Sequence, residues 1–232
     1  YYNKEIFAKA GVQVPKTLDE MNALAEKLTD AKAGINGYVG RGLKNANMTL
    51  WTNYFLNYGG EFLDAKGNIL TDGPEAIEAT KSYVRSNKSS PPGVAGFNWM
   101  ESLASFAQGR AAMWIDGVGW APGVENPNSS RVVGKVGYAM VPAGPKGQYS
   151  ATYGDGIGIA AASKNKEAAY LLCQWTVSKA QGARLLQAGG GVPFRNSILN
   201  DETVRSGVKL PKGWLQSVID AGKISKLGLP VI

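Results

Sequence analysis

The stretch from Gln148 to Leu172, Q-Y-S-A-T-Y-G-D-G-I-G-I-A-A-A-S-K-N-K-E-A-A-Y-L-L, decides how the rest of the chain is interpreted. Its glycines at 154, 156 and 158 invite comparison with the dinucleotide-binding loop of Rossmann folds. In that loop the glycines follow a strand and lead into a helix, whereas here they precede an apolar run that predicts a strand over 156–162. Asp155 would also place negative charge where a pyrophosphate binds. The stretch therefore excludes a Rossmann fingerprint and predicts a strand followed by a helix.

Helical and extended patterns alternate along the remainder of the chain. The clearest helix is predicted over 17–31, where Thr17 and Glu20 form a capping box before apolar residues at helical spacing. Shorter apolar runs predict strands at 35–40, 111–115 and 135–142. Further helices are predicted at 3–10, 47–58, from Pro74 onward, 98–108, 165–177, 179–188 and 211–221. This alternation is typical of an α/β domain whose central sheet is covered by helices.

The composition excludes several classes of chemistry. The chain of 232 residues contains no histidine and a single cysteine, Cys173. Catalysis by serine–histidine or cysteine–histidine pairs and metal sites with histidine ligands are therefore excluded. We expect no metal and no cofactor. No stretch approaches the roughly 18 apolar residues that would span a bilayer.

The net charge of +7 raises the question of nucleic acid. The basic residues are spread along the chain as singles and pairs, without a cluster or a helix-long basic stripe. A solvated basic surface explains this distribution better than a nucleic-acid interface. We therefore expect no nucleic-acid partner, and a basic nucleic-acid module is only the third hypothesis.

Polar and aromatic groups gather where predicted strands begin or end. Arg41 follows the strand at 35–40, and Asp116 follows the strand at 111–115 with Trp120 close behind. Tyr153 and Asp155 precede the strand at 156–162. Arg195 lies in the loop G-G-G-V-P-F-R. Such strand ends line ligand crevices in open α/β sheets. Charged groups that bind hydroxyls, beside flat rings that cover C–H faces, favour a sugar site.

Each of these residues also has a structural interpretation. Asp116 could cap the helix after it, and Arg41 and Arg195 could form surface ion pairs. The indoles of Trp51, Trp114 and Trp175 are typical of a core. Alternatively, Asp116 and Asp155 could be the acid pair of a carbohydrate-active hydrolase, if they lay a few ångströms apart across a sugar ring.

Five motifs follow one another along the chain: Y-Y-N-K-E-I-F-A-K-A-G-V-Q-V-P-K-T-L-D-E-M, Y-G-G-E-F-L-D, F-A-Q-G-R-A-A-M-W-I-D-G, G-I-G-I-A-A-A-S-K-N-K-E-A-A-Y and G-G-G-V-P-F-R-N-S-I-L. Their order resembles the extracellular solute-binding proteins of ABC transporters that take up sugars and sugar alcohols, and the resemblance covers nearly the whole chain. Within that family, four further stretches are most similar to the branch that binds polyols and related monosaccharides: R-G-L-K-N, S-P-P-G, M-W-I-D and S-S-R-V-V-G-K-V-G-Y-A-M-V-P.

The resemblance implies a receptor without chemistry of its own, with a class II periplasmic binding protein fold. Such a receptor closes two lobes about a sugar or polyol and presents it to a membrane permease. The protein would be periplasmic or extracellular, either free or lipid-anchored. Carried over by position, the cleft residues are Asp116, Trp120, Tyr153, Asp155 and Arg195, and more weakly Arg41, Asn47 and Trp51.

The resemblance also implies an incomplete chain. Residues 1–156 would form the second lobe, 157–205 would pack on a first lobe that is absent here, and 206–232 would return to the second lobe. Apolar residues of the middle segment, including Leu171, Leu172, Trp175 and Leu186, would then be partly uncovered. We expect a partner chain covering residues 165–205, a swapped dimer or a proteolysed chain.

Overall fold

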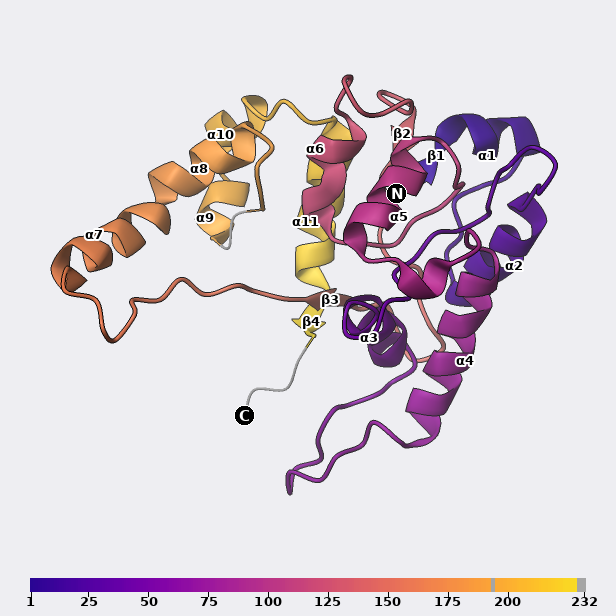
Figure 1. The fold of residues 1–232 in the computed structure, drawn as a ribbon, viewed down its shortest axis with the longest axis horizontal. Coiled ribbons are helices and arrows are strands. Elements are labelled where there is room, and N and C mark those ends of the chain that lie inside the picture. The colour runs from indigo at the N-terminus through magenta and orange to yellow at the C-terminus, as the bar shows by residue number, and fades with distance from the viewer. Residues whose placement is uncertain (193–194, 229–232) are drawn as a thin grey trace.

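A small mixed sheet lies in the upper right of Figure 1, which draws the computed structural model; the structure describes residues 1–192 and 195–228. Strand β1 (Tyr2–Asn3) pairs antiparallel with β2 (Val136–Gly137). Isolated bridges extend this sheet, because Tyr2 pairs with Met113 on its other side and Val39 lies parallel to Trp114. The predicted strands at 35–40 and 111–115 therefore lie side by side, although they form isolated bridges rather than continuous strands. The predicted strand at 135–142 is reduced to β2.

Four helices pack on one another beside this sheet, and their ends follow local sequence signals. They are α1 (Lys4–Ala10), α2 (Leu18–Leu28), α3 (Met48–Asn57) and α4 (Pro74–Lys88). Gly11 ends α1 in the left-handed conformation, at φ 62°, and Thr17 and Glu20 form the predicted capping box of α2. Their shared core includes Leu18, Met21, Leu50, Tyr54, Phe55 and Tyr83.

A second core surrounds Trp114, which is completely buried. Helix α5 (Trp99–Ala107) contributes Phe106, and the ring of Tyr1 stacks on the indole of Trp114 with a centroid distance of 4.9 Å. Two short elements follow the sheet: the 3-10 turn η2 (Val118–Trp120) and α6 (Ala121–Val124). The core interpretation of Trp114 is confirmed.

A third core joins the C-terminal helices to α6. These are α8 (Lys179–Gln187), α9 (Asn196–Leu199), α10 (Glu202–Ser206) and α11 (Lys212–Lys223). The Trp214 indole on α11 donates a 2.8 Å hydrogen bond to the Val118 carbonyl. Leu186 is completely buried in this core. The expectation that Leu186 would be uncovered is therefore wrong, because α11 and its neighbours pack over it.

Residues 153–165 run as an extended arm from the body of the molecule to α7 (Lys166–Thr176) (Figure 1). The predicted strand at 156–162 is wrong: these residues form no strand, and most are exposed. A single strand cannot satisfy its backbone groups without a neighbour, and no strand pairs with this run within the described part of the chain. The prediction considered the apolar run without its pairing partner.

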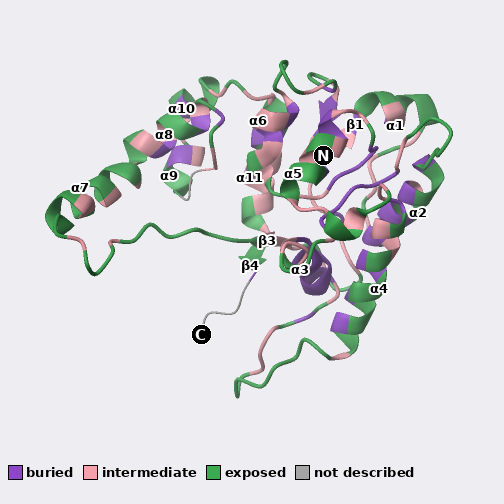
Figure 2. Ribbon diagram, in the orientation of Figure 1, coloured by how far each residue is buried: buried purple, intermediate pink, exposed green. Residues whose placement is uncertain are grey.

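Helix α7 carries an apolar face that is exposed (Figure 2). Leu171, Leu172 and Trp175 are 64%, 57% and 57% exposed, as predicted for a helix separated from its usual packing surface. The alternative interpretation of Trp175 as a core residue is therefore wrong.

The part of the chain that runs from the arm through α11 lies between two paired strands. Strand β3 (Ser150–Thr152) pairs in parallel with β4 (Ser225–Leu227), with Ala151 opposite Lys226. Residues 193–194 and 229–232, which include parts of the G-G-G-V-P-F-R loop and of the predicted final segment, lie outside the described residues. Among the helices that are described, none is long and apolar enough to cross a membrane.

Candidate functional site

A buried ion pair between Arg41 and Asp116 organises the candidate site. The parallel bridge between Val39 and Trp114 brings the ends of two sheet segments together, and Arg41 and Asp116 each follow one of them by two residues. The Arg41 Nε donates to Asp116 Oδ2 at 2.8 Å, and a terminal nitrogen of the guanidinium pairs with Oδ1. The Asp116 side chain is completely buried and that of Arg41 is 9% exposed. The pair is therefore internal and bidentate, not the surface ion pair considered for Arg41.

The Asp116 carboxylate accepts further hydrogen bonds from its own chain. The Gly117 amide donates to Oδ1 at 2.6 Å, and the Trp120 indole nitrogen donates to the same oxygen at 2.9 Å. Because its oxygens are occupied and buried, Asp116 fixes Arg41 and Trp120 in place and does not present a free carboxylate. The ligand contact predicted for Asp116 stays a prediction.

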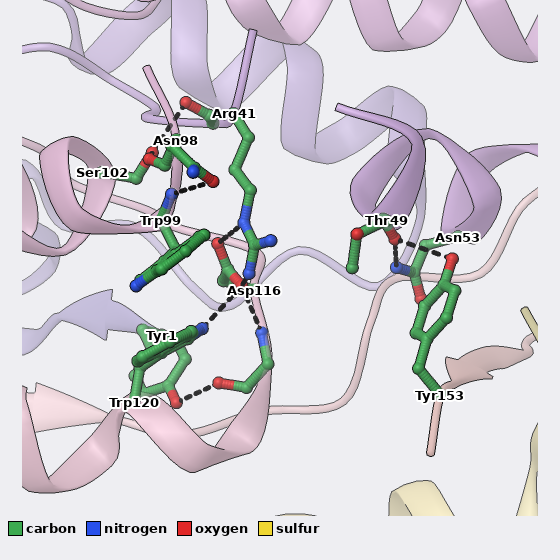
Figure 3. A network of polar contacts seen from close by, with 12 residues as sticks. Tyr1, Arg41, Thr49, Asn53, Asn98, Trp99, Ser102, Asp116, Trp120 and Tyr153 are labelled. Carbon is green, nitrogen blue, oxygen red and sulfur yellow. Dashed lines mark hydrogen bonds and ion pairs between the residues drawn. The ribbon is translucent and has the colours of Figure 1, made fainter. Parts of the chain in front are cut away.

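The Arg41 guanidinium lies beside a pair of stacked indoles (Figure 3). The rings of Trp99 and Trp120 lie 6.0 Å apart between centroids, with an interplanar angle of 12°. The central carbon of the Arg41 guanidinium lies 6.0 Å from each ring centroid, within the range of a cation–π contact. Trp99 is 37% exposed. The cluster therefore combines flat apolar faces with a fixed cation.

Trp99 is the residue that the sequence predictions missed. A signal for it exists, because Asn98 and Glu101 form a capping box that begins α5 at Trp99. The capping box places Trp99 in the first turn of α5, ahead of the buried residues of that helix. This position leaves part of the indole exposed.

Tyr153 lies across from this cluster, against the first turn of α3 (Figure 3). Its hydroxyl donates to the Thr49 carbonyl at 3.3 Å, and the side chain is 40% exposed. Next to it, Asn53 Oδ1 accepts the Ala151 amide at 2.9 Å and so attaches β3 to α3. Burial raises the pKa of the Tyr153 hydroxyl, while its interaction with the Thr52 side chain and the charge of Arg41 oppose this shift.

Two residues expected at the site belong to α3 or its start. Asn47 precedes α3, is half-buried, and makes no side-chain cap to it. Trp51 faces the core: its ring stacks on Phe55 at 4.6 Å, and its indole nitrogen donates to Thr80 Oγ1 at 2.8 Å. The core interpretation of Trp51 is confirmed, and its ligand role stays a prediction.

The remaining candidates lie on other segments. Asp155 is exposed on the arm. Arg195 precedes α9, and its Nε donates to the Val177 carbonyl at 3.1 Å. The hydrolase hypothesis needs Asp116 as an accessible acid, whereas this carboxylate is buried and occupied. Across the described ranges 1–192 and 195–228, no cluster of three or more acidic, cysteine or histidine side chains could hold a metal ion.

Residues 1–183 match the family described as bacterial extracellular solute-binding protein. The match covers most of the chain, and the chain belongs to this family. The resemblance inferred from the sequence motifs is thereby confirmed, as is the α/β binding-protein fold, which solved structures share.

The relatives that this chain resembles include proteins named or solved as solute-binding proteins. A probable amino-acid ABC transporter periplasmic-binding protein of Sinorhizobium fredii is 30% identical over 86% of this chain and 46% of its own length. The mannitol-binding protein of Pseudomonas aeruginosa is 30% identical over 78% of this chain and 43% of its own length. A solute-binding protein of Agrobacterium radiobacter, solved with ribitol, is 32% identical with a TM-score of 0.83, over 96% of this chain and 56% of that one. The chain thus spans about half the length of the relatives it matches.

Proposed function

We propose that this chain forms one wall of a sugar or polyol site in the substrate-binding component of an ABC importer. The observation that carries the proposal is the cluster of Arg41, Trp99 and Trp120, exposed at its rim and held from behind by Asp116. The ribitol and mannitol named for two relatives support this ligand class.

The geometry suits an uncharged polyhydroxyl ligand. Indole faces pack against the C–H side of such a ligand, and the guanidinium N–H groups not engaged by Asp116 donate to its hydroxyl oxygens. Since Asp116 balances the charge of Arg41, the site presents donors without excess charge. The proposed role is binding without catalysis, in keeping with a family of solute-binding proteins.

We further propose that the opposite wall belongs to the part of the relatives that this chain does not match. In this proposal residues 1–156 and 206–232 form one lobe, and the segment 157–205 packs against the other lobe through α7, since α8, α9 and α10 share a core with α6 and α11. Tyr153, Asp155, Asn47 and Arg195 would then contribute ligand contacts around the cluster. The apolar face of α7 would be covered by the second lobe, by a partner chain or by a swapped dimer.

The last part of the proposal is that the protein acts outside the cytoplasm and delivers its bound ligand to a membrane permease. It is in keeping with a family of bacterial extracellular binding proteins. Such a protein would work free in the periplasm or held by a lipid. Metabolic labelling with a fatty acid distinguishes the two forms, and light scattering of this chain identifies a dimer.

The test is a thermal-shift panel on the complete protein that carries this chain. Ribitol, D-mannitol, neutral monosaccharides and amino acids are each added at rising concentration. Saturable stabilisation by a polyol or sugar is expected, at about 2.7 kcal/mol when the ligand reaches 100 times its Kd. The proposed ligand class would be contradicted if only amino acids stabilised the protein, or if none of the carbohydrates did.

Two variants locate the site within the same panel. Trp120→Ala removes one indole face and should weaken binding of the responding polyol at least tenfold. Ile69→Ala, the control, removes a 70% exposed apolar side chain from the loop between α3 and α4 and should leave ligand affinity unchanged. An equal loss in both variants would place the ligand elsewhere.

A further inference from the structure

The backbone on both sides of Arg41 is held by two buried hydroxyls from different helices. The Tyr83 hydroxyl on α4 donates to the Arg41 carbonyl. Ser102 on α5 is completely buried, and its Oγ lies 2.9 Å from the Gly40 carbonyl oxygen and 2.9 Å from the Asn98 carbonyl oxygen, so its one hydroxyl hydrogen is shared between them. Two consecutive carbonyls are therefore bound by side chains distant in sequence, outside any regular strand.

The segment also fits closely between its neighbours. A Cβ at Gly40 would lie 2.8 Å from Asn87 Oδ1 and 2.9 Å from the Tyr38 ring, and one at Gly42 would lie 2.3 Å from the Val94 carbonyl oxygen. There is no space for the backbone to shift toward these neighbours. The two hydroxyls thus fix a backbone that packing already confines, and the direction of the Arg41 side chain follows from it.

We infer that Tyr83 and Ser102 are positioning residues for the binding role of Arg41, setting the position of its guanidinium beside Trp99 and Trp120. This inference rests on the proposed function for its binding consequence. The geometric part does not, because the orientation of Arg41 is measurable without ligand. Tyr83 remains a donor in any ordinary buffer, since burial raises its pKa to about 12.

Tyr54 supplies a matched control for Tyr83. It is completely buried, its ring meets that of Tyr83 edge-on at 5.5 Å, and its hydroxyl donates to Ser86 Oγ at 2.8 Å instead of to the Arg41 segment. Tyr83→Phe and Tyr54→Phe each remove one buried hydrogen bond. Both should lower the Tm by a comparable amount, about 2–4 °C.

The ligand-free experiment measures hydrogen exchange at the Arg41 Nε–H by NMR, with the resonance assigned by its loss in Arg41→Lys. Tyr83→Phe should accelerate exchange at least threefold, because the guanidinium leaves Asp116 more often, whereas Tyr54→Phe should leave the rate unchanged. Ser102→Ala should act like Tyr83→Phe. Its control is Ser105→Ala on the same helix, which removes a buried hydroxyl without a hydrogen-bond partner in the described residues. Equal exchange rates in the Tyr83 and Tyr54 variants would overturn the inference.

The binding experiment uses ribitol and D-mannitol with the complete protein. Tyr83→Phe should weaken affinity about threefold to tenfold, as expected for one buried hydrogen bond, and Tyr54→Phe less than twofold. If the unmodified protein binds neither probe, the proposed ligand class fails while the exchange result still decides the positioning role. If affinity falls equally in both variants, the positioning role is overturned.

Discussion

Helices α3 and α7 have similar lengths and opposite environments. In α3 every residue from Leu50 to Asn57 is buried, whereas no residue of α7 is buried, although it carries Leu171, Leu172 and Trp175. Helix α3 packs against α4 and β3, and α7 contacts mainly α8, the next helix in the chain. The comparison shows that apolar residues alone do not bury a helix. Burial also requires a second surface that packs against the apolar face of the helix.

The largest expected difference is at the centre of α3. Phe55→Ala should destabilise the fold by about 3–5 kcal/mol, because the ring is completely buried and stacks on Trp51. Leu172→Ala on α7 should change the unfolding free energy by less than about 0.5 kcal/mol. Urea denaturation of this chain measures both. Comparable losses would mean that α7 is covered in solution.

Two glycines extend the comparison beyond the helices. A Cβ at Gly60, just after α3, would lie 2.1 Å from the Phe55 ring, so Gly60→Ala should cost about 1–3 kcal/mol. A Cβ at Gly158, on the arm before α7, meets nothing within 4 Å. Gly158→Ala should therefore cause no measurable loss in the same denaturation series, and a loss there would show that the arm is packed.

Alkaline titration probes α3 through Tyr54. Burial raises the pKa of Tyr54 to about 12. Since an unfolded tyrosine ionises near pH 10, this group favours the fold fully below pH 10, and its contribution falls between pH 10 and 12 by about 1.4 kcal/mol per pH unit. The free energy of unfolding, measured by denaturation across this pH range, should fall less steeply with pH in Tyr54→Phe than in the unmodified protein. An unchanged slope would show that Tyr54 ionises in the folded protein as it does in water.

The smallest energetic effect is expected for cleavage of the arm. Lys164 and Lys166 lie at the end of an exposed, irregular segment, and trypsin should cut there first. Residues 1–152 should stay resistant, since their helices share two buried cores. Mass spectrometry of timed digests identifies the order of cuts, and early cleavage within α3 would contradict it.

Local signals in the sequence predict most helices correctly. The capping box of Thr17 and Glu20, the proline at the start of α4 and the glycine after α1 all mark real boundaries. The strand at 156–162 fails for a different reason, because a strand depends on a partner that a short window does not contain. Leu186 fails in the opposite direction, since α11, distant in sequence, covers it.

The site is only partly predictable for the same reason. Arg41, Asp116 and Trp120 stand at segment ends, and sheet pairing brings them together as expected. Their roles depend on contacts that spacing in the sequence does not reveal. The Asp116 carboxylate is buried and bonded to its neighbours, Trp51 packs in the core, and Trp99 belongs to a different helix, α5. Position in the chain indicates which residues gather, whereas burial decides which of them can meet a ligand.

The buried pairing of Arg41 with Asp116 has a kinetic consequence. A cation and an anion so close together produce little field beyond a few ångströms, so the cluster cannot attract a distant ligand, despite the net charge of +7 of the whole chain. An uncharged solute would reach such a surface by unassisted diffusion. Its association rate would then be nearly the same in dilute buffer and in concentrated salt, and capture would proceed alike in fresh and in saline surroundings.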